Sequence, residues 1–155
     1  MPIIIILLCL ALMLFQDAKY RKIHVIFPVT IFAVSIFMVK NKMVGYGIYN
    51  VLFLAVTFVF LIIYISLKQR AFINPFKNYF GLGDLLFYIS VTPLFLIHNY
   101  ILFFIFSLLF SIVIHYLFIK LSDNKTIPLA GYASLFLIII ILKDSLTHYP
   151  PFTLI

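Results

Sequence analysis

The sequence lacks tryptophan and glutamate, and it contains one cysteine and four acidic residues, all of them aspartates. Cys9 alone cannot form a disulfide framework or a cysteine-based zinc site within the chain, so we interpret it as a small packing residue. Charged residues are 10% of the 155 positions, whereas 66% are hydrophobic and the mean hydropathy is +1.25. One small core cannot bury that much apolar surface, so no soluble domain is expected. The composition predicts an integral membrane protein.

Six apolar segments, separated by polar residues, are predicted to be membrane helices. They comprise residues 2–15, 24–39, 48–67, 85–97, 100–119 and 127–142. The expected fold class is an all-α, polytopic helical bundle of about six transmembrane helices, with residues 1–155 forming one membrane-embedded domain. A tight hairpin at residues 98–100 should separate the fourth segment from the fifth, because the merged stretch is too long for one ordinary span. The first segment lacks a basic start and a cleavage site, so we interpret it as a retained helix rather than a signal peptide.

The formal net charge of +7 is spread over loops rather than gathered on one surface. Lys and Arg occur in twos and threes between apolar segments, which is typical of membrane-protein loops and does not indicate a nucleic-acid partner. The loops after the first, third and fifth segments contain Lys19, Arg21, Lys22, Lys68, Arg70, Lys77, Lys120 and Lys125. The other side has only Lys40, Lys42 and Lys143. This bias predicts that the first set of loops is cytoplasmic and that both termini lie outside.

Two aspartates lie at predicted helix ends on the cytoplasmic side, Asp17 after the first segment and Asp84 before the fourth. Carboxylates in such places are costly to desolvate and usually face a polar cavity or a partner. If two of them lie close together, like-charge repulsion raises the pKa of one, so that one is protonated and the other ionised. Such a pair can activate water for attack on a peptide carbonyl and protonate the oxyanion and the leaving amine. Because the pair titrates together, the acid and base roles stay unassigned.

The stretch FGLGDL, residues 80–85, places Asp84 directly behind Gly81 and Gly83. We expect the glycines to permit positive φ and the close approach of a neighbouring helix or an extended substrate. Asp84 is expected near the positive end of a helix dipole. A plainer interpretation stays open here: a loop that ends in an N-cap aspartate, with the glycines serving the turn.

Three segments together resemble a known family. Gly81-Leu-Gly-Asp84 resembles the Gly-x-Gly-Asp signature of the membrane aspartic proteases, specifically the prepilin peptidase (type IV leader peptidase) family. The stretch DAKYRKI, residues 17–23, looks like that family's other catalytic segment, and IPLAGYA, residues 127–133, is similar to the opening of its last helix. The resemblance covers nearly the whole chain in order and spacing. The chain departs from the family pattern at His24 and Leu86, beside the two motifs.

The resemblance implies that Asp17 and Asp84 are the catalytic aspartates of an endopeptidase of the short, peptidase-only form, with no cofactor. Its substrate would be a prepilin or pseudopilin, which has a basic leader followed by a hydrophobic helix. Cleavage would occur at the cytoplasmic face of a bacterial or archaeal cell membrane, in type IV pilus assembly or protein secretion.

The resemblance also assigns Gly81 and Gly83 to loop geometry or substrate binding. For Arg21, Lys22 and Lys77 we expect contacts with acidic lipid headgroups or with an acidic residue of the substrate. The alternative is a non-catalytic membrane transporter or assembly subunit, in which the same carboxylates bind a cation or pair with Lys and Arg.

The remaining polar residues are interpreted as structural. Asp123 and Asp144 each lie near a lysine and are expected to be ordinary loop charges. The histidines show no local metal-ligand spacing and are expected at interfaces or in packing: His24, His98, His115 and His148. Tyrosines near helix ends are expected at the membrane interface: Tyr20, Tyr46, Tyr49, Tyr79 and Tyr100. Pro150 and Pro151 should end any helix and leave a short external tail.

Overall fold

A computed structural model of the chain describes residues 2–39, 44–69, 81–118, 127–146 and 151–154. These residues form six α-helices and one 3₁₀ helix, with no strand among them. The helices are α1 (Pro2–Tyr20), α2 (Ile26–Met38), α3 (Val44–Gln69), α5 (Leu82–Ser90), η1 (Thr92–Leu94), α6 (Ile97–Phe118) and α7 (Leu129–Leu146). The expected all-α class is confirmed.

Four helices, α1, α3, α6 and α7, are long and apolar enough to cross a membrane. The other two are shorter, since α2 has 13 residues and α5 has 9. At a rise of 1.5 Å per residue, 13 residues extend about 20 Å, whereas the hydrocarbon core of a bilayer is about 30 Å thick. The fold is therefore that of a membrane-type helical protein with four full-length candidate spans.

The expected fourth segment, residues 85–97, is broken. Helix α5 ends at Ser90, and Pro93 lies in η1 before α6 begins at Ile97. Proline has no N–H for the helical ladder, and its ring clashes with the carbonyl four residues earlier, so the α-helix stops before it. The expected division of this stretch into two helical segments is confirmed, but its position at residues 98–100 is wrong. The break lies at residues 91–96, and residues 98–100 belong to the first turn of α6.

A buried asparagine satisfies the carbonyl groups that this break exposes. The Asn50 side chain of α3 donates from Nδ2 to the Thr92 carbonyl oxygen at 2.7 Å and to the Phe95 carbonyl oxygen at 2.8 Å. Asn50 is fully buried, so these two bonds replace helical partners that water cannot supply. The contact fixes the first half of α3 against η1.

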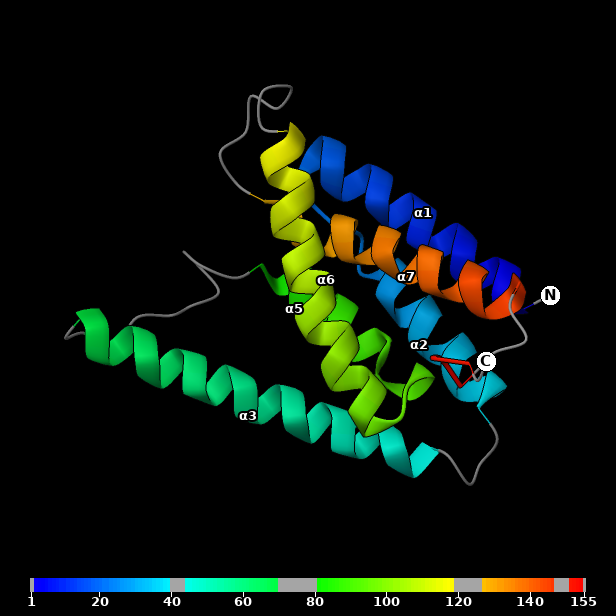
Figure 1. Cartoon of the computed structure of the whole chain (residues 1–155), viewed down its shortest axis with the longest axis horizontal. Helices are drawn as coiled ribbons and strands as arrows, with labels where there is room; N and C mark the ends of the chain where they lie inside the picture. The colour runs from blue at the N-terminus through cyan, green and yellow to red at the C-terminus, as the bar shows by residue number, and fades with distance from the viewer. Residues whose placement is uncertain (1, 40–43, 70–80, 119–126, 147–150, 155) are drawn as a thin grey trace.

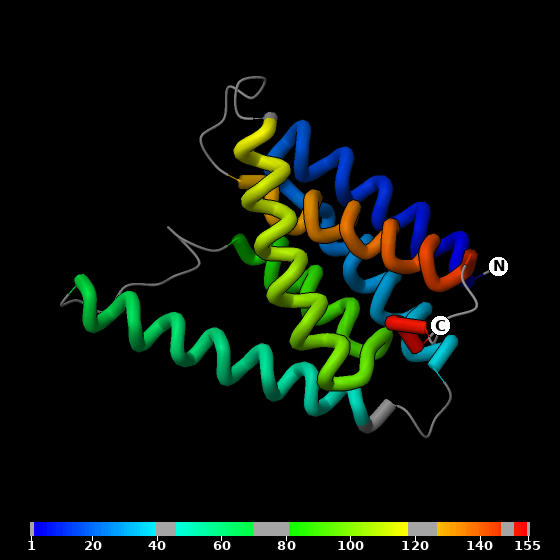
Figure 2. The backbone as a smooth tube through the Cα atoms, viewed as in Figure 1, coloured from blue at the N-terminus to red at the C-terminus, as the bar shows by residue number. Residues whose placement is uncertain are grey.

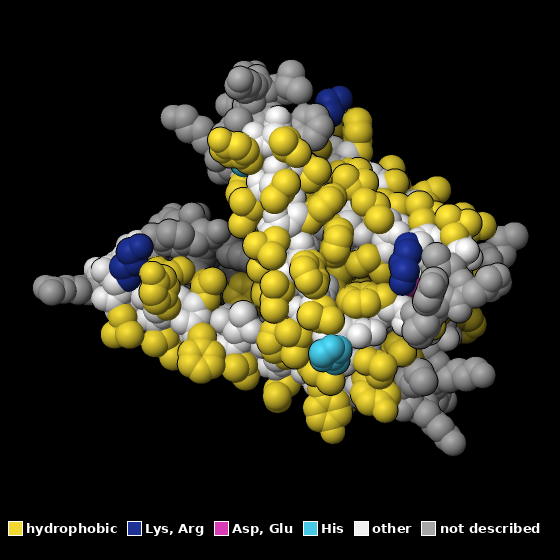
Figure 3. All heavy atoms as spheres, viewed as in Figure 1, with side chains coloured by type: hydrophobic (Ala, Val, Ile, Leu, Met, Phe, Trp, Pro, Cys, Tyr) yellow, Lys and Arg dark blue, Asp and Glu magenta, His cyan; other side chains and the backbone are white. Residues whose placement is uncertain are grey.

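Helices α1 and α7 lie side by side, α2 packs against α1 and α5, and α6 packs against α7 (Figure 1). Helix α3 touches η1, α5 and α6, while its far end stands apart from the other helices (Figure 2). The accessible surface is 10017 Å², against about 8,000 Å² expected for a compact soluble protein of this mass. Apolar side chains cover most of the face drawn in Figure 3, as a lipid-facing surface requires.

The centre of the bundle is aromatic. Phe95 and Phe103 stack with ring centroids 4.9 Å apart, and the Tyr100 hydroxyl donates to the Tyr88 carbonyl oxygen at 3.0 Å. Tyr100 was expected at the membrane interface, but it is fully buried, because it lies beside the break where the chain folds back on α5. Tyr20, Tyr46 and Tyr49 are exposed, whereas Tyr79 lies outside the described residues.

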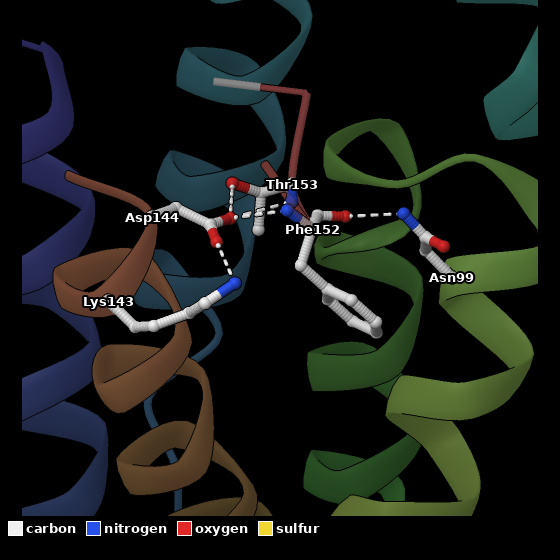
Figure 4. Close-up of polar contacts among 5 residues, drawn as sticks. All are labelled: Asn99, Lys143, Asp144, Phe152 and Thr153. Carbon is white, nitrogen blue, oxygen red and sulfur yellow. Dashed lines mark hydrogen bonds and ion pairs between the residues drawn. The ribbon is translucent and has the colours of Figure 1, made fainter. Parts of the chain in front are cut away.

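Asp144, near the end of α7, holds the C-terminal segment against the bundle (Figure 4). Its Oδ2 accepts hydrogen bonds from the Phe152 N–H at 2.9 Å, the Thr153 N–H at 2.8 Å and the Thr153 hydroxyl at 2.8 Å. Lys143 pairs with its Oδ1 at 3.3 Å, and Asn99 of α6 donates to the Phe152 carbonyl oxygen. The expectation of an ordinary loop charge is wrong for Asp144, whose side chain is 3% exposed. Asp123 lies outside the described residues.

The Asp144 anchor gives a stability prediction. Asp144→Ala should lower the free energy of unfolding by about 2–3 kcal/mol, because it removes the acceptor of three donors that burial hides from water. Thermal unfolding of the purified protein in detergent measures the loss. Ser145→Ala, at an exposed neighbour in the same turn, serves as the control and should leave stability unchanged. Equal stability of the two variants would contradict the anchoring role.

Candidate functional site: two carboxylates at the start of α7

Asp17 belongs to the inward face of α1. Along this helix the buried side chains recur at Ile6, Leu10, Met13 and Asp17, while the opposite stripe at Ile4, Leu8, Leu12 and Phe15 is exposed. The spacing of three to four residues is that of one face of an α-helix. Asp17 therefore lies inside the bundle although it is charged, and it is only 7% exposed.

The partner of the Asp17 carboxylate is a backbone group from the other end of the sequence. The Gly131 N–H donates to Asp17 Oδ2 at 2.7 Å, across a separation of 114 residues. A Cβ at position 131 would lie 3.1 Å from both Cβ and Oδ2 of Asp17. Only glycine lets the two helices come this close without moving the carboxylate.

Asp84 lies in the first turn of α5, three residues after the N-cap Gly81. Its Oδ2 accepts from the Gly81 N–H at 3.2 Å, and its own N–H donates to the Gly81 carbonyl oxygen at 3.1 Å. The plainer interpretation of Asp84 as the N-cap residue is therefore wrong. Its other oxygen, Oδ1, accepts from the Ala130 N–H at 2.8 Å.

The two carboxylates thus bind consecutive N–H groups, those of Ala130 and Gly131, in the first turn of α7. The first N–H groups of a helix have no partner within it and form the positive end of its dipole, which favours negative charge. The carboxylates are also close enough for the charge of Asp17 to act on Asp84. The structure therefore brings together the two aspartates that the sequence placed at one end of the bundle.

The two glycines of the FGLGDL stretch act through close approach. No described glycine has a positive φ, and that of Gly81 is −70°, so the expected left-handed conformation is wrong. A Cβ on Gly83 would lie 3.1 Å from Cδ1 of Ile23, in the loop after α1. The space at Gly83 is occupied by this chain's own Ile23, which joins the two motif segments directly.

Three basic residues were predicted near the site. Arg21 follows α1, and its N–H donates to the Asp17 carbonyl oxygen at 3.1 Å. Arg21 lies one helical turn after Asp17, and its guanidinium charge acts on the Asp17 carboxylate. Lys22 is exposed, and Lys77 lies outside the described residues.

The conformation of Arg21 is unusual. Its φ of 54° is the single positive value among the described residues other than glycine. Arg21 ends α1 in a position where glycine is the common residue. A side chain in this left-handed conformation costs about 1 kcal/mol relative to glycine.

Sequence reasoning did not assign roles to Ala130, Gly131 or Ile23. The stretch IPLAGYA, residues 127–133, was noted for its resemblance, and its small residues behind a proline were the available signal of a helix start with room for a neighbour.

His115 is buried and His24 and His98 are exposed, whereas His148 is outside the described residues. Within the described part of the chain, no three His, Cys, Asp or Glu side chains are grouped so that they could hold a metal ion.

Comparisons of the chain with protein-family models, curated proteins and solved structures found no match.

The Gly83–Ile23 contact gives a prediction that does not depend on activity. Gly83→Ala should destabilise the protein, because the new Cβ meets the Ile23 side chain at 3.1 Å. Adding Ile23→Ala removes Cγ1 and Cδ1 and should relieve that clash. A double-mutant cycle of unfolding free energies should then show a coupling of at least about 0.5 kcal/mol. Additive effects would mean that the two motif segments do not touch in solution.

Proposed function

We propose that this chain is a membrane aspartic endopeptidase of the prepilin peptidase kind, which cleaves the leader peptide of prepilin or pseudopilin substrates. The observation that carries the proposal is that Asp17 and Asp84, 67 positions apart in the sequence, bind adjacent N–H groups of α7. Two carboxylates on neighbouring donors are held in a fixed relation, which is what general acid–base chemistry by a pair requires.

The reaction follows from a pair that holds one proton. The ionised carboxylate takes a proton from water as its oxygen attacks the peptide carbonyl carbon, and the protonated carboxylate gives its proton to the carbonyl oxygen. When the tetrahedral intermediate collapses, the C–N bond breaks and the amine leaves with a proton from the pair. The two aspartates act as a coupled unit, so neither is assigned a fixed role.

The membrane setting is part of the proposal. Helices α2 and α5 with η1 would complete six membrane segments, their short length being accommodated by local thinning of the bilayer. The excess of Lys and Arg in the loops favours a cytoplasmic location for the two carboxylates and an external location for both termini. A bacterial or archaeal cell membrane, with lipids around the bundle, would then present a pilin-like transmembrane substrate to the site.

One observation favours a second candidate, a non-catalytic transporter or assembly subunit. Asp17 interacts with the charge of Arg21, and both aspartates accept backbone hydrogen bonds that join helices. Such contacts alone would give the carboxylates a purely structural or cation-binding role. The two candidates differ in what happens when a carboxylate becomes an amide.

Under the proposed function, Asp17→Asn and Asp84→Asn should each reduce kcat/KM for a model prepilin by at least about 10²-fold, because each removes a group that transfers protons. The measurement is the ratio of processed to unprocessed prepilin on co-expression, followed by kinetics with the purified protein in detergent.

Asp123→Asn, the same substitution at the aspartate expected to be an ordinary loop charge, is the matched control and should leave cleavage unchanged. Full cleavage by either site variant would refute the protease. Absence of cleavage by the unmodified protein, together with a loss of ion flux in the Asp17→Asn and Asp84→Asn variants, would favour the second candidate.

Gly131→Ala tests the geometry while both carboxylates are kept. The new Cβ would lie 3.1 Å from Asp17 Oδ2, so the carboxylate must move and its hydrogen bond to the residue 131 N–H must weaken. We expect a loss of about 10-fold or more in kcat/KM with little change in KM. In the control Gly47→Ala the nearest atom to the new Cβ is Pro93 Cα at 3.7 Å, an ordinary contact, and activity should persist. Equal activities of the two variants would contradict the role of Gly131 in positioning Asp17.

A further inference from the structure

The guanidinium of Arg21 contains two buried nitrogens that the described chain leaves without a partner. Nε and Nη1 are both buried, and neither has a hydrogen-bond acceptor among the described residues. Buried polar groups in folded proteins are nearly always paired, and leaving a charged donor unpaired is costly. Two such donors on one side chain indicate that an acceptor is supplied from elsewhere.

The backbone of Arg21 strengthens this point. With a φ of 54°, position 21 would be occupied at lower cost by glycine, which would end α1 through the same N–H to Asp17 carbonyl bond. The helix end itself provides no interaction that would offset the cost of a long charged side chain in a strained conformation. The side chain, rather than the turn, is therefore the feature to explain.

The charges near Arg21 indicate that the missing acceptor is electrically neutral. Its charge acts on the Asp17 carboxylate, yet the ion pair found in the described ranges joins Lys143 to Asp144 at the opposite end of α7. A pair of aspartates that holds one proton carries a charge of −1, which the guanidinium balances. A neutral acceptor keeps this buried group of charges balanced, whereas a further anion would leave an excess negative charge.

We infer that the Arg21 guanidinium binds a main-chain carbonyl oxygen of the substrate, beside the peptide bond that is cleaved. The inference rests on the proposed function and adds to it a residue that touches the substrate. It replaces the expected contact with an acidic substrate residue or lipid headgroup. A cation that donates to the backbone would fix the register of an extended peptide at the two carboxylates, whatever the side chains of that peptide.

Arg21→Gly removes the side chain while allowing the backbone to keep its conformation. Glycine adopts a φ of 54° without strain, so this variant should retain or exceed the thermal stability of the unmodified protein. Its kcat/KM for a model prepilin should fall about 10- to 100-fold, the value of a hydrogen bond to a charged group. Arg21→Lys keeps the charge with a different donor geometry and should recover part of the loss. Lys68→Ala, at an exposed lysine in the last turn of α3, also removes one positive charge; it is the control and should cleave normally.

The binding of substrate peptide to an inactive variant tests the Arg21 contact without catalysis. The protein used is the inactive Asp17→Asn/Asp84→Asn double variant in nanodiscs, with either Arg21 or Gly at position 21. A labelled prepilin peptide is titrated with each of the two proteins, and its binding is measured by fluorescence anisotropy. Peptides in which one amide near the cleavage site is replaced by an alkene lack one carbonyl oxygen. One of them should bind about 10-fold more weakly than the parent peptide when Arg21 is present, and equally to the parent in the Arg21→Gly background.

The outcomes separate the two proposals. If the unmodified protein processes no prepilin, the proposed function fails. If it does and Arg21→Gly processes prepilin equally well, or if no alkene peptide is coupled to position 21, the inference about Arg21 is wrong while the protease stands. An effect of Arg21→Gly that appears only in nanodiscs containing anionic lipid would assign the guanidinium to a lipid headgroup and would equally overturn the carbonyl contact.

Discussion

Two N–H groups in the first turn of α7 organise the polar centre of an otherwise apolar molecule. Burying a carboxylate is expensive unless it is hydrogen-bonded, and a bundle built from Leu, Ile, Val and Phe offers few side-chain donors. The helix start supplies donors that exist in any sequence, because its first N–H groups have no partner within the helix. Asp17 from α1 and Asp84 from α5 therefore meet at α7, and three helix ends are fixed by two short bonds.

This constraint explains the small residues around the site. Gly131 admits the Asp17 side chain, Gly83 admits Ile23, and Gly81 lies so close to Asp84 that a Cβ there would be 2.9 Å from Oδ2. Each glycine is used for space rather than for a special φ. The loop after α1 is thereby pressed against the start of α5, which keeps Arg21 near the carboxylates.

Much of the fold could be predicted, since long apolar segments between charged loops define helices α1, α3, α6 and α7. The meeting of Asp17 and Asp84 could be predicted in outline, because the loop charges place both at one side. The donors at Ala130 and Gly131 could not, since a backbone N–H leaves no trace in residue type. Asp144 was misjudged for the same reason: its partners include the backbone of Phe152 and Thr153, beyond two prolines, so the adjacent Lys143 suggested a surface charge.

The separation between donor and acceptor has a consequence for biosynthesis. Asp17 is synthesised 114 residues before the Gly131 N–H that binds it, and Asp84 precedes Ala130 by 46. During translation the early helices must enter their environment with these carboxylates lacking their final partners, and the site is assembled only when the first turn of α7 arrives. A nascent chain that stops short of α7 would hold both aspartates in the wrong setting. The polar centre is therefore completed only late in the synthesis of each molecule.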